Sequence, residues 1–388
     1  MMNPCYLTNI QIQQVRHLKD ITIPLSTETC KHLILTGKNG SGKTSVMEAL
    51  EKTLKSFSML DSTQHINVTK ELRFRTLLPP EDTGLSVEIY NQEKLQQLLV
   101  EGQYILAYYA DEREYVVTNE KHISKMQFKQ QYAIADHPGK EFVKYLLDLK
   151  STAAMAEVAG KQKRAAEIKQ WFVNFDSILQ QVFDNPMVHL DFNIDTYEFS
   201  IIEPGKEPFS FDTLSRGYAA ILDIVTDLMM RMEQKAGKNY DLPGIVLIDE
   251  VETHLHLALQ KKIMPMLTTL FPNIQFVVTT HSPFVLNSIE DVVIYDLENH
   301  TLVQGKEGLS NIPYEGIIEG YFQASTLSDE LQKKYNQYKQ LVHKPTLTDE
   351  DYVTLSALEF YLDEIPDYLA VDFMADYKKL KLELEERS

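Results

Sequence analysis

The sequence has few cysteines and no long apolar run. Its two cysteines, Cys5 and Cys30, lie far apart and outside any C-x-x-C spacing. This pattern argues against a disulfide framework and against a zinc site. No stretch reaches the roughly 18 apolar residues of a transmembrane helix. Residues 1–14 alternate polar and apolar side chains without the apolar core of a signal peptide. We therefore expect a cytoplasmic protein with no membrane segment.

Positive charge is also scarce. The chain has 38 Lys and Arg against 56 Asp and Glu, a formal net charge of −18, which argues against a protein that coats nucleic acid over its whole surface. A local basic groove stays open as an alternative, because one helical stretch carries Lys161, Lys163, Arg164 and Lys169. A solvated helix face is the favoured interpretation of that cluster. The hydrophobic content of 44% is sufficient for one large domain or two.

The most informative stretch is a glycine-rich loop that matches G-x-x-x-x-G-K-[ST] at every fixed position. It follows an apolar run at 32–36, expected to be a buried strand, and precedes an amphipathic helix at 45–55. Such a loop turns its backbone N–H groups around a polyphosphate, and the helix N-terminus adds a favourable field. Lys43 would reach the β and γ phosphates, and Thr44 would hold Mg²⁺. The predicted nucleotide-binding residues are Gly37, Lys38, Asn39, Gly40, Ser41, Gly42, Lys43, Thr44 and Ser45.

Two further strand ends carry polar side chains. The run 244–248 reads as a central parallel strand that ends in Asp249 and Glu250. We expect Asp249 to bind the magnesium ion beside Thr44, and Glu250 to polarise the attacking water. The run 274–280 ends at His281, which can sense the γ-phosphate through a hydrogen bond.

The remaining patterns predict the order of the elements. Strands are expected at 7–12 and 20–25, joined by a turn that contains Arg16, and at 85–90 and 104–109. Arg16 would lie near the nucleotide's sugar or phosphates, or else be a surface arginine. Residues 128–183 are expected to form a helical insertion into a sheet that resumes at 188–192 and 197–202. Helices at 219–232 and 257–270, a last edge strand at 292–296 and a helical stretch from 315 complete the prediction.

The phosphate loop, Leu214-Ser215-Arg216-Gly217, the Asp249-Glu250 strand and His281 follow the order of the ABC-type ATPases. Over about residues 1–300 the chain resembles their RecF, SMC and overcoming-lysogenisation-defect branch, including its entry turn around Arg16. The resemblance implies an α/β fold of the ABC-type P-loop NTPases, with a mixed central sheet, an inserted helical lobe and a short C-terminal helical tail. It also implies ATP and Mg²⁺ as cofactors, Glu250 as catalytic base and His281 as switch histidine.

In this branch the signature loop of one subunit closes on the nucleotide of the other. The resemblance therefore implies a homodimer, or a larger ring of stacked dimers, in which Ser215, Arg216 and Gly217 act in trans. Two positions differ from the family pattern. Arg216 replaces the usual signature glycine, and no glutamine stands at 110–113, where the Q-loop glutamine is expected.

Four regions follow from this comparison: an N-terminal ATPase lobe (1–127), the helical insertion (128–185), a C-terminal ATPase lobe (186–312) and a helical partner-binding region (313–388). The insertion, the segment 314–321 and the short tail are similar to the ATPase subunits of Septu and retron anti-phage defence systems. This likeness implies a separate HNH-type nuclease as partner, and nucleic acid, either DNA or retron RNA/DNA, as a further one. Fewer than a hundred residues follow the last expected strand, and none reads as a strand ending in paired aspartates, so we expect no intrinsic Toprim nuclease.

We expect an ATP-driven switch, in which ATP closes the homodimer, hydrolysis reopens it and the nucleotide state regulates a partner nuclease. Two other functions compete with this switch. One is a DNA-repair clamp of the RecF kind, which grips duplex DNA and is disfavoured by the acidic balance. The other is a scaffold that retains a degenerate ATPase fold, which is disfavoured because Lys43, Thr44, Asp249, Glu250 and His281 are all present.

Overall fold

The computed structural model describes residues 5–58, 84–113, 115–118, 122–233, 235, 240–304, 329–363, 365 and 371–387. The chain divides into two compact units, Met1–Ile312 and Pro313–Ser388, and each has its own apolar core. The segment 314–321, which is similar in sequence to the ATPase subunits of defence systems, lies outside the described residues. Over the described ranges, every helix is too short or too polar to serve as a membrane span.

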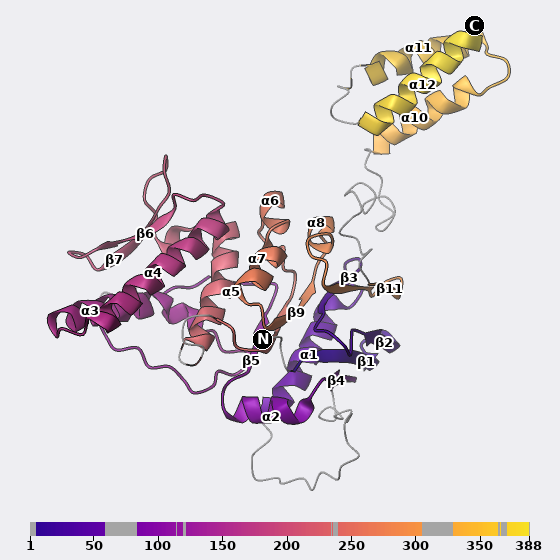
Figure 1. Ribbon diagram of the computed structural model, residues 1–388. Coiled ribbons are helices and arrows are strands. Elements are labelled where there is room, and N and C mark those ends of the chain that lie inside the picture. The colour runs from indigo at the N-terminus through magenta and orange to yellow at the C-terminus, as the bar shows by residue number, and fades with distance from the viewer. Residues whose placement is uncertain are drawn as a thin grey trace. The chain divides into compact units, whose positions relative to one another are not determined.

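The first unit is built on a six-stranded mixed sheet in the order β11-β10-β3-β9-β8-β5. Figure 1 labels its strands β11, β3, β9 and β5. All strands except β11 run parallel. The continuous apolar runs of β8, β9 and β10 are buried at every residue, as expected of a sheet covered on both faces. The predicted α/β fold with a mixed central sheet is therefore confirmed. The strands are β3 (His32–Thr36), β5 (Ile105–Tyr109), β8 (Gly244–Ile248), β9 (Ile274–Thr279), β10 (Val292–Asp296) and β11 (Thr301–Gln304).

A second, antiparallel sheet has the order β2-β1-β4. It consists of β1 (Leu7–Val15), β2 (Leu18–Pro24) and β4 (Leu85–Ile89). Helix α1 (Lys43–Ser58) shares one apolar cluster with strands of both sheets, so it packs between them. The buried side chain of Gln275 joins the sheets, because its Oε1 accepts from Leu7 N at 2.7 Å and its Nε2 donates to Lys31 O at 2.7 Å. Helix α2 (Gln92–Val100) follows β4 and was not predicted.

The helical lobe contains α3 (Phe142–Val158), α4 (Gln162–Phe183) and the start of α5 (Arg216–Met232), with short turns η1 (Pro138–Glu141) and η2 (Phe211–Thr213). An aromatic cluster holds it together: Phe142 lies 5.1 Å from Phe175 and 6.0 Å from Phe211 between ring centroids. Trp171 stacks on Phe175 at 5.5 Å. Stacked and edge-on rings are the preferred arrangements of aromatic side chains, so α3, α4 and η2 share one closely packed core.

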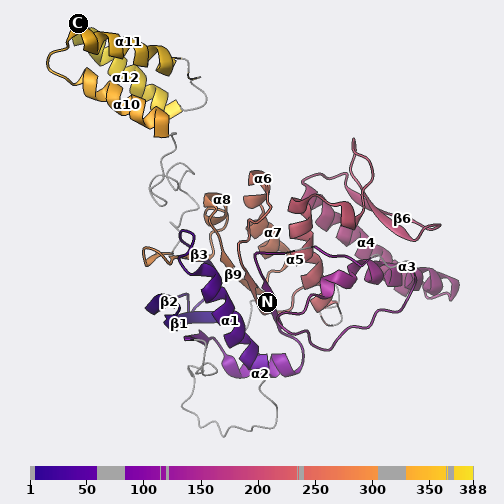
Figure 2. The same cartoon turned by 180° about the vertical axis from the view of Figure 1, so that it is seen from behind.

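The prediction that the central sheet resumes after the lobe is wrong. β6 (His189–Asn193) and β7 (Glu198–Ile202) pair only with each other among the described strands, and form a hairpin beside α4 in both views (Figures 1 and 2). Its anchor to the lobe is Asp176 of α4, which accepts a hydrogen bond from Leu190 N at 2.7 Å. β6 alternates polar and apolar residues, and this pattern suits a half-exposed hairpin rather than a strand buried on both faces.

Two other element predictions need correction. The expected edge strand at 292–296 is internal, because Asp296 caps a tight turn through Glu298 N (2.8 Å) and leads into the outer strand β11. The expected helix at 257–270 is split into α6 (Leu257–Gln260) and α7 (Ile263–Leu270). Proline lacks an N–H and is tolerated in the first turn of a helix. The break places Pro265 in that turn of α7.

The described residues of the second unit form three helices, α10 (Asp329–Val342), α11 (Asp349–Asp363) and α12 (Val371–Arg387). Their apolar faces form a separate core around Tyr338, Leu362 and Tyr377, each fully buried. Tyr338 donates to Glu359 at 2.8 Å and Tyr377 donates to Asp363 at 2.9 Å. The buried tyrosines therefore keep partners for their hydroxyl groups, as buried polar groups require.

Candidate functional site

The glycine-rich loop connects β3 to α1 at the carboxyl edge of the central sheet. Gly37 and Gly42 have φ of +135° and +99°, and a Cβ on either would lie 2.8 Å from a neighbouring side-chain atom, Ser41 Oγ or Leu18 Cδ1. Only glycine fits both positions without strain. Helix α1 begins at Lys43 and has no acidic residue in its first turn. The N–H groups of that turn can therefore face an anion.

The side chain of Lys43 is buried under this loop. Its Nζ donates to Gly37 O at 3.1 Å, and it lies 2.6 Å from His281 Nε2 and 3.6 Å from Glu250 Oε1. Burial lowers the pKa of Lys43, and the nearby carboxylates of Glu250 and Asp249 oppose that shift. The structure thus brings Lys43, Glu250 and His281 together at one point.

Asp249 follows β8 and is completely buried. Its N donates to Tyr109 O at 2.8 Å, and its Oδ1 accepts from the hydroxyl of Thr279. Burial raises the pKa of Asp249, which the hydroxyls of Thr279 and Thr44 oppose. Its other oxygen, Oδ2, has no hydrogen-bond partner among the described residues. An unpartnered buried carboxylate oxygen beside the Thr44 hydroxyl is a donor set that fits a hard divalent cation.

Glu250 has a backbone φ of +48°, which is uncommon for a residue with a side chain. Burial alone would raise the pKa of its carboxylate, but the hydrogen bond and charge of His281, followed by Lys43, lower it overall. His281 Nε2 lies 3.1 Å from Glu250 Oε1 as well as close to Lys43. A single neutral tautomer can accept from Lys43 or donate to Glu250 through this nitrogen, but it cannot do both.

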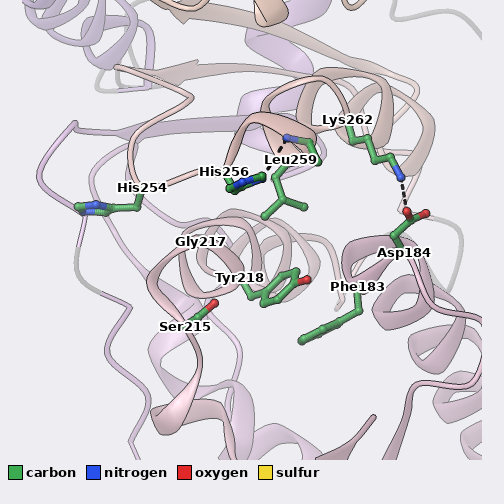
Figure 3. Close-up of a pocket in the computed structure, with 10 residues that line it drawn as sticks. Phe183, Asp184, Ser215, Gly217, Tyr218, His254, His256, Leu259 and Lys262 are labelled. Carbon is green, nitrogen blue, oxygen red and sulfur yellow. Dashed lines mark hydrogen bonds and ion pairs between the residues drawn. The ribbon is translucent and has the colours of Figure 1, made fainter. Parts of the chain in front are cut away.

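The signature-like residues lie at a different place in the first unit. Ser215 precedes α5, and a Cβ on Gly217 would lie 3.1 Å from His254 O. Both line a cavity of about 540 Å³ (Figure 3). Tyr218 points into it and stacks on Phe183 with 4.2 Å between ring centroids. No residue of the glycine-rich loop is among the lining residues: Phe183, Asp184, Ser215, Gly217, Tyr218, His254, His256, Ala258, Leu259 and Lys262.

Arg16 and Arg216 are both exposed. Arg16 occupies the turn between β1 and β2 with φ of +51°. The next two residues, His17 and Leu18, lie against Gly42, so the turn packs on the glycine-rich loop. Arg16 therefore lies near the glycine-rich loop, and its contact with a nucleotide stays a prediction.

Three contributors to the site were missed from the sequence. Thr279 accepts from Glu250 N at 2.7 Å and also contacts Asp249. Glu252 accepts from His281 N, and burial raises its pKa. Arg113 lies in the loop where the Q-loop glutamine was sought, and its guanidinium reaches the end of β8. Thr279 is the last residue of β9 and Arg113 stands four residues after β5, so both lie at the carboxyl edge of the central sheet, but their side-chain partners are distant in sequence.

Comparisons with known proteins identify a family and several similar proteins. Residues 67–287 match a family described as "AAA domain, putative AbiEii toxin, Type IV TA system". The chain is 32% identical over 195 residues to "Retron Ec83 probable ATPase" of Escherichia coli, covering 48% of this chain and 34% of that protein. It is 25% identical over 411 residues to "Septu protein PtuA" of Bacillus mycoides (strain KBAB4), covering 98% of this chain and 55% of that protein. The chain thus spans about half or less of the length of these curated relatives.

Solved structures that are similar in part include a crystal structure of "the SmcHead bound to the C-winged helix domain of ScpA", with a TM-score of 0.39 and 15% identity over 75% of this chain and 94% of that one. An "SMC head domain from Thermotoga maritima" matches with a TM-score of 0.38 and 13% identity over the same shares. The family match, by contrast, covers more than half of the chain and includes Asp249, Glu250 and His281. The protein therefore belongs to the AAA-domain family of the putative AbiEii toxin type, which confirms the predicted membership of the AAA family ATPases.

Proposed function

We propose that this protein binds ATP with Mg²⁺ and hydrolyses it, and that it serves as the ATPase subunit of an anti-phage defence complex. The observation that carries the proposal is the meeting of the start of α1 with the ends of β8 and β9: Lys43, Glu250 and His281 lie within 3.6 Å of one another. Ligands of open α/β sheets bind at the carboxyl ends of the strands, which is where these residues stand.

Each residue has a distinct part in this proposal. Lys43 and the N–H groups of the glycine-rich loop would hold the phosphates. Thr44 and Asp249 would hold Mg²⁺, which supplies neutralisation of phosphate charge when bound. Glu250, whose pKa is lowered, stays ionised at neutral pH and can orient a water molecule and take its proton. His281 Nε2 contacts both Glu250 and Lys43. When ATP binds, this nitrogen would give up one of these two contacts and form a hydrogen bond with the γ-phosphate.

The proposal includes a homodimer in which Ser215, Arg216 and Gly217 complete the site of the other subunit. The separation of the two sites supports it, since the cavity beside Ser215 has no lining residue from the glycine-rich loop of its own chain. Ser215 caps α5 without a side-chain hydrogen bond to the helix. Its hydroxyl and the helix N-terminus are thus available to a phosphate. A triphosphate bound between two copies would favour the closed dimer, and hydrolysis would reopen it.

The defence role is inferred from the relatives. Their names, a retron ATPase and Septu protein PtuA, support an ATPase that works within a defence system. We propose that the helical insertion (128–185) and the C-terminal region (313–388) transmit the nucleotide state to a separate HNH-type nuclease. The basic cluster on α4 gives the RecF-like alternative little support, because Arg164 pairs with Glu167 and Lys169 pairs with Glu157.

Steady-state ATP hydrolysis tests the first part of the proposal. Lys43→Ala should weaken ATP binding by tenfold or more, a loss of about 1.4 kcal/mol, and abolish turnover. Lys52→Ala is the matched control, because Lys52 is an exposed lysine on the same helix. Glu250→Gln should lower kcat by about 100-fold or more while ATP still binds. A wild-type protein without turnover above the Lys43→Ala level would contradict the proposal.

Sedimentation velocity tests the dimer. The Glu250→Gln protein with ATP and Mg²⁺ should double its mass relative to the nucleotide-free protein, and Ser215→Arg should prevent this change by placing a bulky charge in the interface. Identical sedimentation with and without ATP would refute the switch while leaving the ATPase intact.

A further inference from the structure

Arg113 contacts the main chain of the candidate catalytic turn, Asp249 and Glu250. It stands four residues after β5, the strand that pairs with β8. Its Nη1 donates to Asp249 O at 3.2 Å and its Nη2 donates to Glu250 O at 3.1 Å. A guanidinium presents its donors in a fixed fork, so two contacts to consecutive carbonyls set their relative orientation.

Arg113 holds a stretch of main chain that has an uncommon backbone conformation at Glu250. Glu250 adopts φ of +48°, a conformation that persists only where its surroundings determine it. On one side, Glu250 N donates to Thr279 Oγ1 at 2.7 Å. On the other side, Arg113 holds the carbonyl of Glu250 itself. The two peptide groups that flank the Glu250 side chain are thus fixed by β9 and by the loop after β5.

The positive charge of Arg113 is balanced by acidic side chains around its guanidinium. Burial lowers the pKa of Arg113, but Asp223, Asp249 and Glu252 surround the guanidinium and favour its charged form. Asp223 belongs to α5, the helix that begins after Ser215. Arg113 therefore lies between the helix of the signature-like loop and the end of β8. Its third nitrogen, Nε, has no partner among the described residues, so the side chain is held mainly through the two carbonyls.

We propose that Arg113 is a positioning residue that fixes the main chain of Asp249 and Glu250, so that the Glu250 carboxylate faces the hydrolytic water. The inference rests on the proposed ATPase function, and it assigns to Arg113 no contact with nucleotide. The side chain acts through Glu250, so its loss should reduce the rate of the chemical step rather than the binding of ATP.

The test compares Arg113→Ala and Arg113→Lys with the wild-type protein, with Arg164→Ala as a control for the loss of an exposed arginine. For Arg113→Ala, kcat should fall by about 100-fold, while KM for ATP and the dissociation constant of a fluorescent ATP analogue stay within about threefold of wild type. Lysine keeps the charge and loses the two-pronged contact, so Arg113→Lys should show an intermediate kcat.

Guanidinium ion at tens of millimolar provides the second readout. It should restore at least about fivefold of the lost rate to Arg113→Ala, and should not raise the rate of wild type or of Glu250→Gln. A kcat within about twofold of wild type, or a loss that appears in KM alone, overturns the inference. If Arg113→Ala does not fold, Arg113→Lys decides by the same split of kcat and KM. A wild-type protein without ATPase activity overturns the proposed function and this inference together, whereas an active wild type with an active Arg113→Ala overturns the inference alone.

Discussion

Replacing Asp227 with asparagine should destabilise the first unit more than any single surface change. Asp227 on α5 is 1% exposed and accepts three hydrogen bonds: from Arg231 Nε at 2.7 Å, Tyr109 OH at 2.8 Å and Gly139 N at 2.9 Å. Arg231 in turn donates to the carbonyls of Leu106 and Ala133 at 3.0 and 3.1 Å. The pair therefore joins the helix that follows the signature-like loop to β5 and to the segment that leads into the lobe.

The magnitude follows from the burial of the pair. Asparagine keeps the shape of the side chain but removes its charge, so Arg231 is left as a buried cation without its ion-pair partner. Breaking one side of a buried ion pair costs about 3–5 kcal/mol, against about 0.5–1.5 kcal/mol for an ordinary hydrogen bond. At about 2–3 °C per kcal/mol for a unit of this size, a loss of about 4 kcal/mol lowers Tm by about 8–12 °C.

Differential scanning calorimetry and urea unfolding followed by circular dichroism measure this loss. Glu157→Gln is the matched control, because it also neutralises a carboxylate in an ion pair, but Glu157 and Lys169 are 44% and 69% exposed. Exposed pairs contribute less than about 1 kcal/mol. Equal Tm values for Asp227→Asn and Glu157→Gln would refute the reasoning. A double-mutant cycle with Arg231→Met should give a coupling energy of at least about 2 kcal/mol.

Three further outcomes are expected. Because burial raises the pKa of Asp249 above its unfolded value, stability present at low pH is lost as the pH rises through the folded pKa; Asp249→Asn should therefore raise the Tm of the nucleotide-free protein at pH 7 and lose this gain at acid pH, and an unchanged Tm at pH 7 in calorimetry would contradict this. Gly42→Ala should weaken ATP binding by about tenfold or more in titration calorimetry, because its Cβ would lie 2.8 Å from Leu18 at φ of +99°; affinity equal to wild type would show that the loop relaxes. Leu362→Ala removes a fully buried side chain from the C-terminal core and should cost about 2–5 kcal/mol in one unfolding transition only, whereas a shift of both transitions would mean that the two units do not unfold separately.

The sequence was sufficient where a motif and its flanking elements are contiguous. β3, the glycine-rich loop and α1 are consecutive, so the apolar run at 32–36, the glycines and the helical pattern predict them without knowledge of distant contacts. The same holds for β8 and β9, whose buried runs end directly at Asp249 and near His281.

Predictions failed where the outcome depends on pairing between distant segments. Strand patterns at 188–192 and 197–202 identified strands, but no local signal shows that they pair with each other and leave the central sheet. The run at 301–304, Thr-Leu-Val-Gln, is only four residues long, and it forms β11 because the capped turn at Asp296 returns it to β10. The contacts of Arg113 join residues 136 and 137 positions apart, and the pattern of one sequence cannot reveal them.

Trp171 gives the protein a built-in optical reporter. It is the one tryptophan of the chain, it is 4% exposed, and it stacks on Phe175 while its Nε1 donates to Glu233, the C-cap residue of α5, at 3.4 Å. Its emission spectrum should thus be blue-shifted in the native state and respond when α4 moves against α5. Intrinsic fluorescence can therefore follow rearrangement of the lobe in the unlabelled chain, in stopped-flow mixing with any added ligand.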